Sequence, residues 1–387
     1  MTHPIEDVAQ CTGCTACASV CGHKAIQMQP DNIGFLYPKV NVQSCTNCGL
    51  CTRICPIINN ALEATKATPS KVYAFRASDE KQLMRSQSGG AFFIISDYIL
   101  SIGGVVYGAT IDNNHKVKHI RATNADLRDK MRGSKYVQSN LSDIYASVRK
   151  DLLDEKTVLF SGTPCQVSGL KSFVNGKSQN KLYTIDLICN GVSSPKIWDD
   201  YLKYLENKYR GHVEKATFRD KKFGWHVTKE TFIINGKEKK RRTFMTMYFK
   251  HLMHRESCYN CVYTNFNRCG DLTIGDFWGW DKICHQYNQQ MNDDKGVSLV
   301  LSNSEKGDSI LTNLLDGHIK IECALKDCIQ PMLVSPVKKP IARDIFLQDY
   351  QNRGFEYVAK KYSDLGLKYR FISLIYRLKG VLTNNKK

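Results

Sequence analysis

Eight cysteines near the start of the chain are the residues whose spacing points most directly to a chemistry. They form two runs, each spaced C-x2-C-x2-C-x3-C: Cys11, Cys14, Cys17 and Cys21, then Cys45, Cys48, Cys51 and Cys55. In such runs three thiolates bind three corners of one [4Fe-4S] cluster, and the fourth cysteine ligates the other cluster. We therefore predict one cluster on Cys11, Cys14, Cys17 and Cys55, and a second on Cys45, Cys48, Cys51 and Cys21. The alternatives are a disulfide framework or two zinc sites, although zinc sites more often use two CxxC pairs.

This cysteine-rich segment resembles the bacterial-type two-cluster ferredoxin domain. Pro56 follows the second run as that pattern expects, whereas Gly22 stands where the first run usually has a proline. The resemblance implies an α+β ferredoxin-like domain at residues 1–60. Between the runs, residues 25–42 alternate apolar and polar positions around the turn residues Asp31-Asn32, which predicts a short hairpin. Residues 61–70 are small and polar, which predicts a linker.

The composition is that of a globular protein with reduced thiols. The chain has 387 residues, of which 42% are hydrophobic, 24% are charged and 16 are cysteines. The first twenty residues lack the apolar core of a signal peptide. The longest apolar run, residues 89–109, is interrupted by Asp97 and by Gly103-Gly104, so it predicts a buried helix and a strand rather than a membrane span. Because iron–sulfur ligands need reduced thiols, we predict a cytoplasmic protein.

The formal net charge of +18 invites a nucleic-acid interpretation. That count treats every cysteine as neutral, and three oxidised clusters with a bound dinucleotide would lower it to about +10. The basic run Lys237–Arg242 follows Asn235-Gly236, a hairpin-turn dipeptide, so it predicts a solvated hairpin and no nucleic-acid partner. We expect the remaining charge to steer an acidic electron carrier, an anionic substrate or an anionic membrane surface.

From residue 71 the sequence alternates strand and helix patterns, which predicts a mixed α/β domain over residues 71–330. The predicted strands are residues 72–77, 104–110, 117–123, 157–160, 182–188, 271–277 and 297–301. The predicted helices are residues 79–87, 91–101, 141–153, 166–174, 195–207, 244–254 and 305–315. Antiparallel additions are predicted at 213–219 and 227–234.

A helical, basic C-terminal extension is predicted for residues 331–387. Its last part, residues 371–387, alternates apolar and cationic residues. This pattern allows a weak membrane-surface contact, although a frayed tail is the favoured interpretation.

Four further cysteines lie where a shared site could form. Cys165 and Cys189 each follow a predicted strand directly, and Cys258 and Cys261 form a CxxC pair on a turn. Because the carboxyl ends of neighbouring strands can meet at one crevice, a third four-thiolate site is predicted. Two alternatives remain at this point: buried thiols with no ligand, or a zinc site on Cys258, Cys261, Cys269 and Cys284.

Four longer motifs resemble the coenzyme F420 hydrogenase/dehydrogenase beta-subunit family, which includes the plant 7-hydroxymethyl chlorophyll a reductase. They are residues 160–171 (FSGTPCQVSGLK), 186–191 (DLICNG), 218–225 (FRDKKFGW) and 271–279 (DLTIGDFWG), within a resemblance that runs from about 71 to about 323. The resemblance implies FAD beside a [4Fe-4S] cluster held by Cys165, Cys189, Cys258 and Cys261. Cys269, Cys284, Cys323 and Cys328 have no assigned role and are expected to be buried or surface thiols.

Three loops are candidates for the flavin site. Ser88, Gly89 and Gly90 open a predicted helix, whose free N–H groups suit a pyrophosphate. Ser134, Lys135 and Tyr136 lie in the turn Arg132–Tyr136, and Thr163 and Asn190 flank the cysteines where they could hydrogen-bond the flavin ring. Lys135, Tyr136 and His226 are the candidate general acids, with a satisfied core histidine as the alternative for His226.

These observations predict an FAD-dependent iron–sulfur oxidoreductase that exchanges electrons between a low-potential ferredoxin-type carrier and an organic small molecule. F420, a small metabolite and a sugar-linked precursor are the substrate classes considered. The first alternative is an electron-transfer beta subunit of a larger hydrogenase or dehydrogenase, docked on a partner oxidoreductase and without its own substrate. The others are an iron–sulfur sensor or nucleic-acid module without flavin, and a degenerate scaffold.

Overall fold

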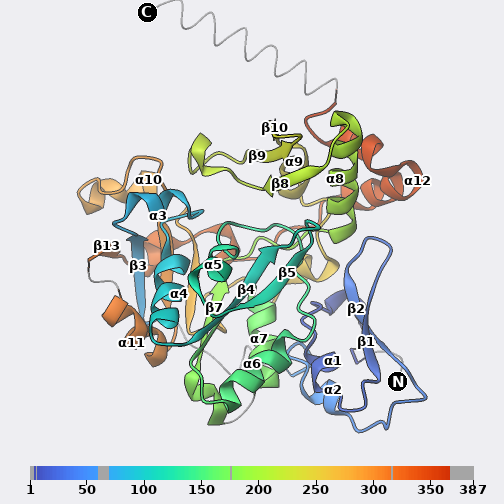
Figure 1. Cartoon of the computed structure of the whole chain (residues 1–387), viewed down its shortest axis with the longest axis horizontal. Helices are drawn as coiled ribbons and strands as arrows, with labels where there is room; N and C mark the ends of the chain where they lie inside the picture. The colour runs from blue at the N-terminus through green and yellow to red at the C-terminus, as the bar shows by residue number, and fades with distance from the viewer. Residues whose placement is uncertain (1–3, 6, 60–68, 175–176, 315–316, 367–387) are drawn as a thin grey trace, which may run out of the picture.

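The computed structural model describes residues 4–5, 7–59, 69–174, 177–314 and 317–366. Most of the predicted linker at 61–70 and all of the predicted tail at 371–387 lie outside these ranges. The described strands form a two-stranded, a three-stranded and an eight-stranded sheet (Figure 1).

The cysteine-rich segment forms a small α+β unit. Strands β1 (Ile26–Pro30) and β2 (Leu36–Val40) pair as an antiparallel hairpin, which confirms the predicted hairpin. The Asp31 carboxylate stabilises the turn by accepting hydrogen bonds from the N–H groups of Ile33 and Phe35. Short helices α1 (Ala16–Val20) and α2 (Leu50–Arg53) lie within the two cysteine runs.

The eight-stranded sheet is the centre of the larger unit. Its order is β13-β3-β12-β11-β7-β6-β4-β5. The pairs β4–β6, β6–β7 and β7–β11 are parallel, and the pairs toward both edges are antiparallel. The bounds are β3 (Lys71–Arg76), β4 (Val105–Ile111), β5 (Val117–Ala122), β6 (Val158–Gly162), β7 (Leu182–Leu187), β11 (Leu272–Asp276), β12 (Ser298–Ser302) and β13 (Ile319–Glu322). The predicted mixed α/β fold is thus observed, and β13 is an edge strand that the sequence patterns did not predict.

Helices cover both faces of this sheet. Ile95 and Ile99 of α4 (Ala91–Ser101) pack with Ile310 of α11 (Glu305–Leu314) on one face. Val148 of α6 (Ile144–Leu153) and Val167 of α7 (Pro164–Phe173) pack on the other. Because both faces are covered, most residues of the central strands are buried, including the polar Thr184 and Asp186 of β7. The remaining short helices are α3 (Glu80–Met84), α5 (Ala125–Asp129) and α10 (Trp280–Ile283).

A third layer combines the antiparallel sheet with three helices. Strands β8 (Val213–Thr217), β9 (Glu230–Ile234) and β10 (Lys237–Arg241) form this sheet in the order β10-β9-β8. Asn235 and Gly236 both have positive φ, so the basic run is the solvated hairpin that the sequence predicts. Helices α8 (Pro195–Tyr209), α9 (Thr243–Phe249) and α12 (Ala342–Tyr362) pack on the sheet around the buried Trp198.

Several helix boundaries differ from the prediction. Helix α7 begins at Pro164, so Cys165 lies in its first turn and not on the loop before it. Helix α3 is capped by Asp79, whose carboxylate accepts from the N–H of Gln82, and not by Ser78. Helix α9 ends at Phe249 instead of reaching residue 254.

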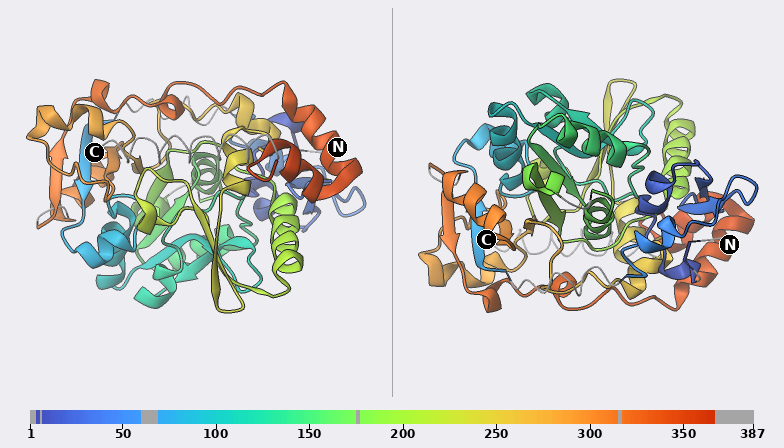
Figure 2. Two further views of the ribbon diagram at one scale, coloured as in Figure 1. Left: turned by 90° about the horizontal axis from the view of Figure 1, so that it is seen from above. Right: turned by 90° about the horizontal axis from the view of Figure 1, so that it is seen from below.

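The cysteine-rich unit is docked on the larger unit beside α7, α8 and α12 (Figures 1 and 2). The tip of its hairpin is buried, since Ile33 and Phe35 belong to the same hydrophobic cluster as Ile197 of α8 and Val358 of α12. The hydroxyl of Ser194 also donates to the Ile33 carbonyl. Among the described helices, none combines the length and apolar character needed to cross a bilayer.

Candidate functional site

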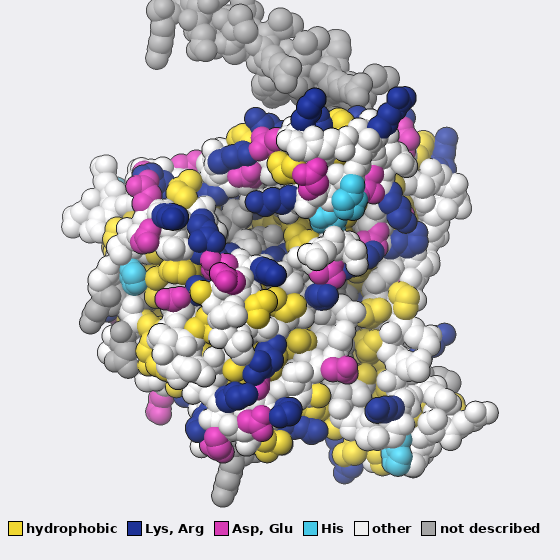
Figure 3. Space-filling model, viewed as in Figure 1, with side chains coloured by type: hydrophobic (Ala, Val, Ile, Leu, Met, Phe, Trp, Pro, Cys, Tyr) yellow, Lys and Arg dark blue, Asp and Glu magenta, His cyan; other side chains and the backbone are white. Residues whose placement is uncertain are grey.

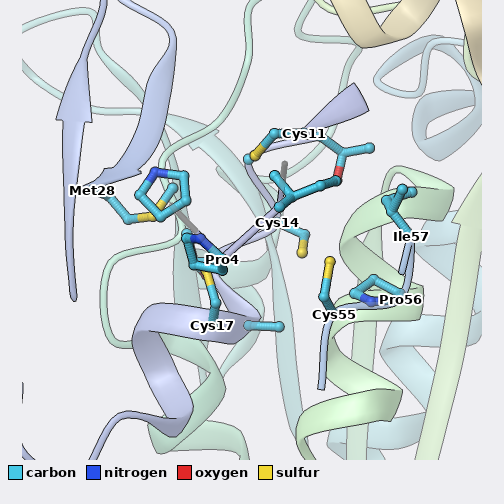
Figure 4. A pocket seen from close by; sticks show the side chains of 14 residues that line it. Pro4, Cys11, Cys14, Cys17, Met28, Cys55, Pro56 and Ile57 are labelled. Carbon is cyan, nitrogen blue, oxygen red and sulfur yellow. The ribbon is translucent and has the colours of Figure 1, made fainter. Parts of the chain in front are cut away.

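Cysteines from both runs face one small cavity in the cysteine-rich unit. Cys11, Cys14, Cys17 and Cys55 line this cavity of about 20 Å³, and the sulfur atoms of Cys14 and Cys55 point toward each other (Figure 4). We call these four residues the first cysteine set. It is the set predicted for one cluster, with three members from the first run and the fourth from the second.

The surroundings of the first cysteine set fit an iron–sulfur cluster. The hydroxyl groups of Thr12 and Thr15 are buried and have no hydrogen-bond partner among the described residues. Cluster sulfur atoms accept such bonds. Burial, with the nearby charges of Cys11 and Cys55, raises the pKa of Cys14 to about 12. A bound cation is therefore needed to ionise this thiol at neutral pH.

The cysteines predicted for the second cluster lie nearer the solvent. Cys48 is exposed, whereas Cys21, Cys45 and Cys51 are half-buried. The N–H of Leu50, at the start of α2, lowers the pKa of Cys48 by hydrogen bonding to its sulfur. The assignment of these four residues to one cluster stays a prediction.

A third cysteine set is assembled from three distant segments. Cys165 in α7, Cys189 after β7, and Cys258 and Cys261 near the 3-10 helix Glu256–Asn260 line a cavity of about 40 Å³. Burial, together with the neighbouring thiols, raises the pKa of Cys258 to about 12 and that of Cys261 to about 11. The fold thus brings together the four residues that the sequence and the family resemblance indicated.

The alternative zinc set is not assembled. Cys284 lies in a different hydrophobic cluster, next to Trp280. Cys269 is buried and its sulfur donates to the Pro164 carbonyl at 3.1 Å. Within the described residues, no three His, Cys, Asp or Glu side chains are grouped to hold a single metal ion. Cys323 and Cys328 are also buried, as expected for thiols without a role.

The first and third cysteine sets are close neighbours across α7. Cys165 and Gly169 are separated by one helical turn, about 6 Å along the axis. A Cβ atom on Gly169 would lie 2.9 Å from the sulfur of Cys14. Thr12 lines both cysteine cavities. One turn of helix therefore spans the distance between the two sets.

A much larger cavity of about 440 Å³ adjoins the third cysteine set. Seven of the eight residues predicted to bind the flavin line it: Ser88, Gly90, Ser134, Lys135, Tyr136, Thr163 and Asn190. Thr163, Cys189 and Asn190 also line the cavity of the third cysteine set, so they form a shared wall. The eighth, Gly89, lies behind the cavity wall, where a Cβ would meet the Phe75 carbonyl oxygen at 2.0 Å.

One part of this cavity has the features of an anion site. Helix α4 begins there after Gly90, and the N–H groups of its first turn have no acceptor within the helix, although that of Ala91 donates to the Ser298 hydroxyl at 3.5 Å. The side chain of Arg132 is only 5% exposed, and its Nη atoms donate to the Gln82 carbonyl and the Ser86 hydroxyl. Its Nε has no partner among the described residues. Lys221 positions this loop from behind by donating to the Ser88 carbonyl at 2.7 Å.

Two of the three candidate general acids lie at the cavity. The amine of Lys135 donates to the carbonyls of Met131 and Arg132 at 2.5 and 3.0 Å, and burial lowers its pKa to about 7. Burial raises the pKa of Tyr136, whose hydroxyl accepts a 3.3 Å hydrogen bond from Arg219.

His226 does not line the large cavity. Its ring is exposed and pairs with Asp294 at 2.6 Å. The alternative of a satisfied core histidine is therefore wrong, because the segment before β9 lies at the surface.

Several cavity residues were missed by the sequence analysis. His119 lines the cavity, donates from Nε2 to the Ser161 carbonyl at 3.0 Å, and has its pKa lowered to about 4 by burial. Asp276 and Trp278 line it as well, and Asp276 accepts from Arg219 at 2.7 Å. The sequence held a partial signal for these residues. Asp276 and Trp278 lie within the motif at 271–279, and His119 lies two residues after Val117 on the same side of β5.

Comparisons with known proteins identify two regions of the chain. Residues 10–59 match the family model of the 4Fe-4S dicluster domain. Residues 155–325 match the model for the C terminus of the beta subunit of coenzyme F420 hydrogenase/dehydrogenase. The second match begins later than the predicted resemblance, which started near residue 71. A search of curated proteins gave no match.

Among solved structures, the chain is similar to one in the F420-reducing [NiFe] hydrogenase complex from Methanosarcina barkeri. The identity is 17% and the TM-score 0.47, over 76% of this chain and 91% of that one. The two family matches confirm the resemblance inferred from the motifs. The chain therefore joins a 4Fe-4S dicluster domain for two [4Fe-4S] clusters, at residues 10–59, to a region at residues 155–325 that is similar to the C terminus of the coenzyme F420 hydrogenase/dehydrogenase beta subunit.

Proposed function

We propose that this protein is an iron–sulfur flavoprotein oxidoreductase that transfers electrons between a ferredoxin-type carrier and an organic small molecule. One observation carries the proposal: the third cysteine set and the 440 Å³ cavity share the wall formed by Thr163, Cys189 and Asn190. A cofactor in the large cavity would lie directly against a cluster on the third set. The volume is in the range of small-molecule and cofactor sites, about 300–1,000 Å³.

Three groups of residues would hold FAD in this cavity. The N-terminus of α4 and the unpartnered Nε of Arg132 suit the pyrophosphate, because both present positive charge to an anion. Tyr136 and Trp278 supply aromatic surface. Thr163 and Asn190 are placed to hydrogen-bond the ring system beside the cysteines.

When bound, the clusters would carry electrons singly and FAD would hold two of them for an organic reaction. In the reducing direction, two reduced one-electron carriers, two protons and one substrate give two oxidised carriers and one reduced substrate. The chain contributes the placement of the sites. Cys48 is at the surface, and the first and third cysteine sets are separated by one turn of α7. Electrons would thus enter near Cys48 and pass inward to the large cavity.

Lys135 is the residue best placed to move a proton at this site. Its pKa of about 7 allows the amine to gain or lose a proton near neutral pH. The carbonyls of Met131 and Arg132 hold the amine at the cavity wall in either state.

The test is anaerobic reconstitution of the full chain with iron, sulfide and FAD, followed by quantification of all three. We expect about twelve irons and about one FAD per chain, since three four-iron clusters are proposed. A brown protein that retains no flavin when FAD is supplied would overturn the flavoprotein assignment. A stable stoichiometric partner in native extract, without turnover of any added electron acceptor, would favour the beta-subunit alternative.

A further inference from the structure

Arg255 occupies the junction between the dicluster unit and the larger unit. Its side chain is fully buried, three residues before Cys258. The guanidinium donates from Nε to the Cys11 carbonyl at 2.8 Å and from Nη2 to the Leu36 carbonyl at 3.0 Å. It also stacks on Tyr37, with Cζ 3.9 Å from the ring centroid. A single side chain of the larger unit therefore holds the loop that begins with Cys11, a member of the first cysteine set.

The remaining contacts of Arg255 fix its position further. Nη1 donates to the Oε1 atom of Gln138 at 2.9 Å, and Gln138 in turn donates to the Thr12 carbonyl at 3.0 Å. A Cβ on Gly13 would lie 2.9 Å from Nη1, and Gly13 has a φ of +68°. The close approach of the guanidinium to the cysteine loop therefore depends on glycine at this position.

The charge of Arg255 has no carboxylate partner within the part of the chain that the structure describes. All three of its hydrogen-bond acceptors are neutral oxygen atoms. An uncompensated buried charge is strongly destabilising, so anions must face this guanidinium in the active protein. Arg255 lines the cavity of the third cysteine set together with Cys165, Cys189 and Cys258. The nearby anions are therefore the thiolates and the clusters that they would bind.

We propose that Arg255 is a positioning residue for electron transfer between the first and third cysteine sets, and that its charge stabilises the reduced state of the clusters there. The proposal rests on the proposed function, because it requires a cluster on the third set. If both sets held clusters, an electron passing between them would leave one cluster and reduce the other. The fixed guanidinium offsets the added negative charge, and its hydrogen bonds keep the two sets at a constant separation.

The test compares Arg255→Met with Arg255→Lys in the reconstituted full chain, using redox titrations monitored by electron paramagnetic resonance. For Arg255→Met we expect the reduced-to-oxidised ratio of a cluster to fall about tenfold at fixed potential, which is about 59 mV for one electron. Arg255→Lys keeps the positive charge, so the reduction potential should shift much less in this variant. The proposal would be overturned if the reduction potentials of Arg255→Met, at full iron content, equalled those of the wild-type protein. It would also be overturned if the potentials of the two variants shifted by the same amount.

Two further measurements keep the outcome interpretable. If Arg255→Met does not accumulate, Arg255→Gln is titrated instead, because glutamine is neutral but keeps a hydrogen-bond donor. The expected fall in reduction potential is the same, and an unchanged potential would again contradict the proposal. The iron content of the wild-type protein distinguishes failure of the proposed third cluster from failure of the proposed role of Arg255. About eight irons per chain would refute the third cluster itself, whereas about twelve irons with no shift in the variants would refute only the role of Arg255.

Discussion

The sixteen cysteines differ in what surrounds their sulfur atoms, and this difference distinguishes the proposed ligands from the other thiols. Members of the first and third sets face shared cavities. Cys269, in contrast, is equally buried but donates to a backbone carbonyl. Burial alone therefore does not identify a ligand; convergence of several sulfur atoms on one space does.

Cys165→Ser should remove about four of about twelve irons per chain and slow flavin reduction by a low-potential donor, while FAD stays bound. The reason is that serine cannot replace the thiolate in the third cysteine set. Iron and flavin analysis of the reconstituted protein measures the effect. Cys269→Ser is the matched control, because a hydroxyl can still donate to the Pro164 carbonyl, and its iron content should be unchanged. Wild-type iron in Cys165→Ser would refute the third cluster.

Lys135 should make FAD affinity depend on pH. With a pKa of about 7, its amine is mostly charged about one pH unit below that value and mostly neutral about one unit above it. The attraction for the FAD pyrophosphate is therefore lost as the pH rises, and the affinity should fall by up to about tenfold over this range.

Fluorescence titration of the cluster-loaded, flavin-free protein at several pH values measures this dependence. Lys135→Met should bind FAD more weakly on the acidic side of neutrality and show a flatter profile. If the variant and the wild-type protein lose affinity in parallel, Lys135 does not contact the bound flavin.

Helix α7 links the sites of the molecule more directly than any other described element. Its first turn carries Cys165, and Thr163 just before it lines both the third cysteine cavity and the large cavity. One turn later, Gly169 lets the helix approach Cys14 of the dicluster unit. The helix also packs against β6 through Val167, so the position of these contacts is fixed by the sheet.

Gly169→Ala tests this contact. Alanine normally stabilises a helix by about 1 kcal/mol relative to glycine, but here its Cβ would lie 2.9 Å from the Cys14 sulfur and 3.0 Å from the Tyr145 hydroxyl. We expect a net loss of roughly 1–3 kcal/mol from overpacking, seen as a lower anaerobic unfolding temperature and less iron on the first cysteine set. Gly22→Ala is the control, because no atom lies within 4 Å of its Cβ position. A stabilised Gly169→Ala protein with full iron would contradict the close packing.

Charged side chains of both signs are mixed on one face of the protein. On the face shown in Figure 3, Lys and Arg side chains are interspersed with Asp and Glu. The formal net charge of +18 still gives a positive overall field. Such a field acts on the rate of encounter with an anionic partner more than on the fold.

Electron transfer from an acidic ferredoxin should therefore depend on salt. Raising the ionic strength from about 10 mM to about 150 mM shortens the screening length from about 30 Å to about 8 Å, so the apparent KM for the carrier should rise several-fold. Stopped-flow reduction of the reconstituted protein measures this, and an uncharged dye of low potential is the control. A carrier KM that does not respond to salt would exclude steering by the net charge.

The spacing of the cysteine runs was enough to predict the two clusters of the dicluster domain, because ligands three residues apart are brought together by local chain geometry. Strand and helix periodicity likewise predicted most of the sheet, and the buried, two-sided strands gave the clearest patterns. The position of four cysteines after strands and on a turn, together with the family motifs, pointed to the third cysteine set and to Thr163 and Asn190 beside it.

Other features depend on contacts between segments far apart in the sequence. Arg255 is held by carbonyls more than two hundred residues away, and His119 reaches the cavity only because β5 lies beside β4 and near β6. His226 is exposed for the same kind of reason, since its position depends on how the loop before β9 packs. Local spacing thus specified the thiols of the dicluster domain. The packing of α7 and the sheet set the distances between the sites, because no short-range pattern encodes the separation of distant segments.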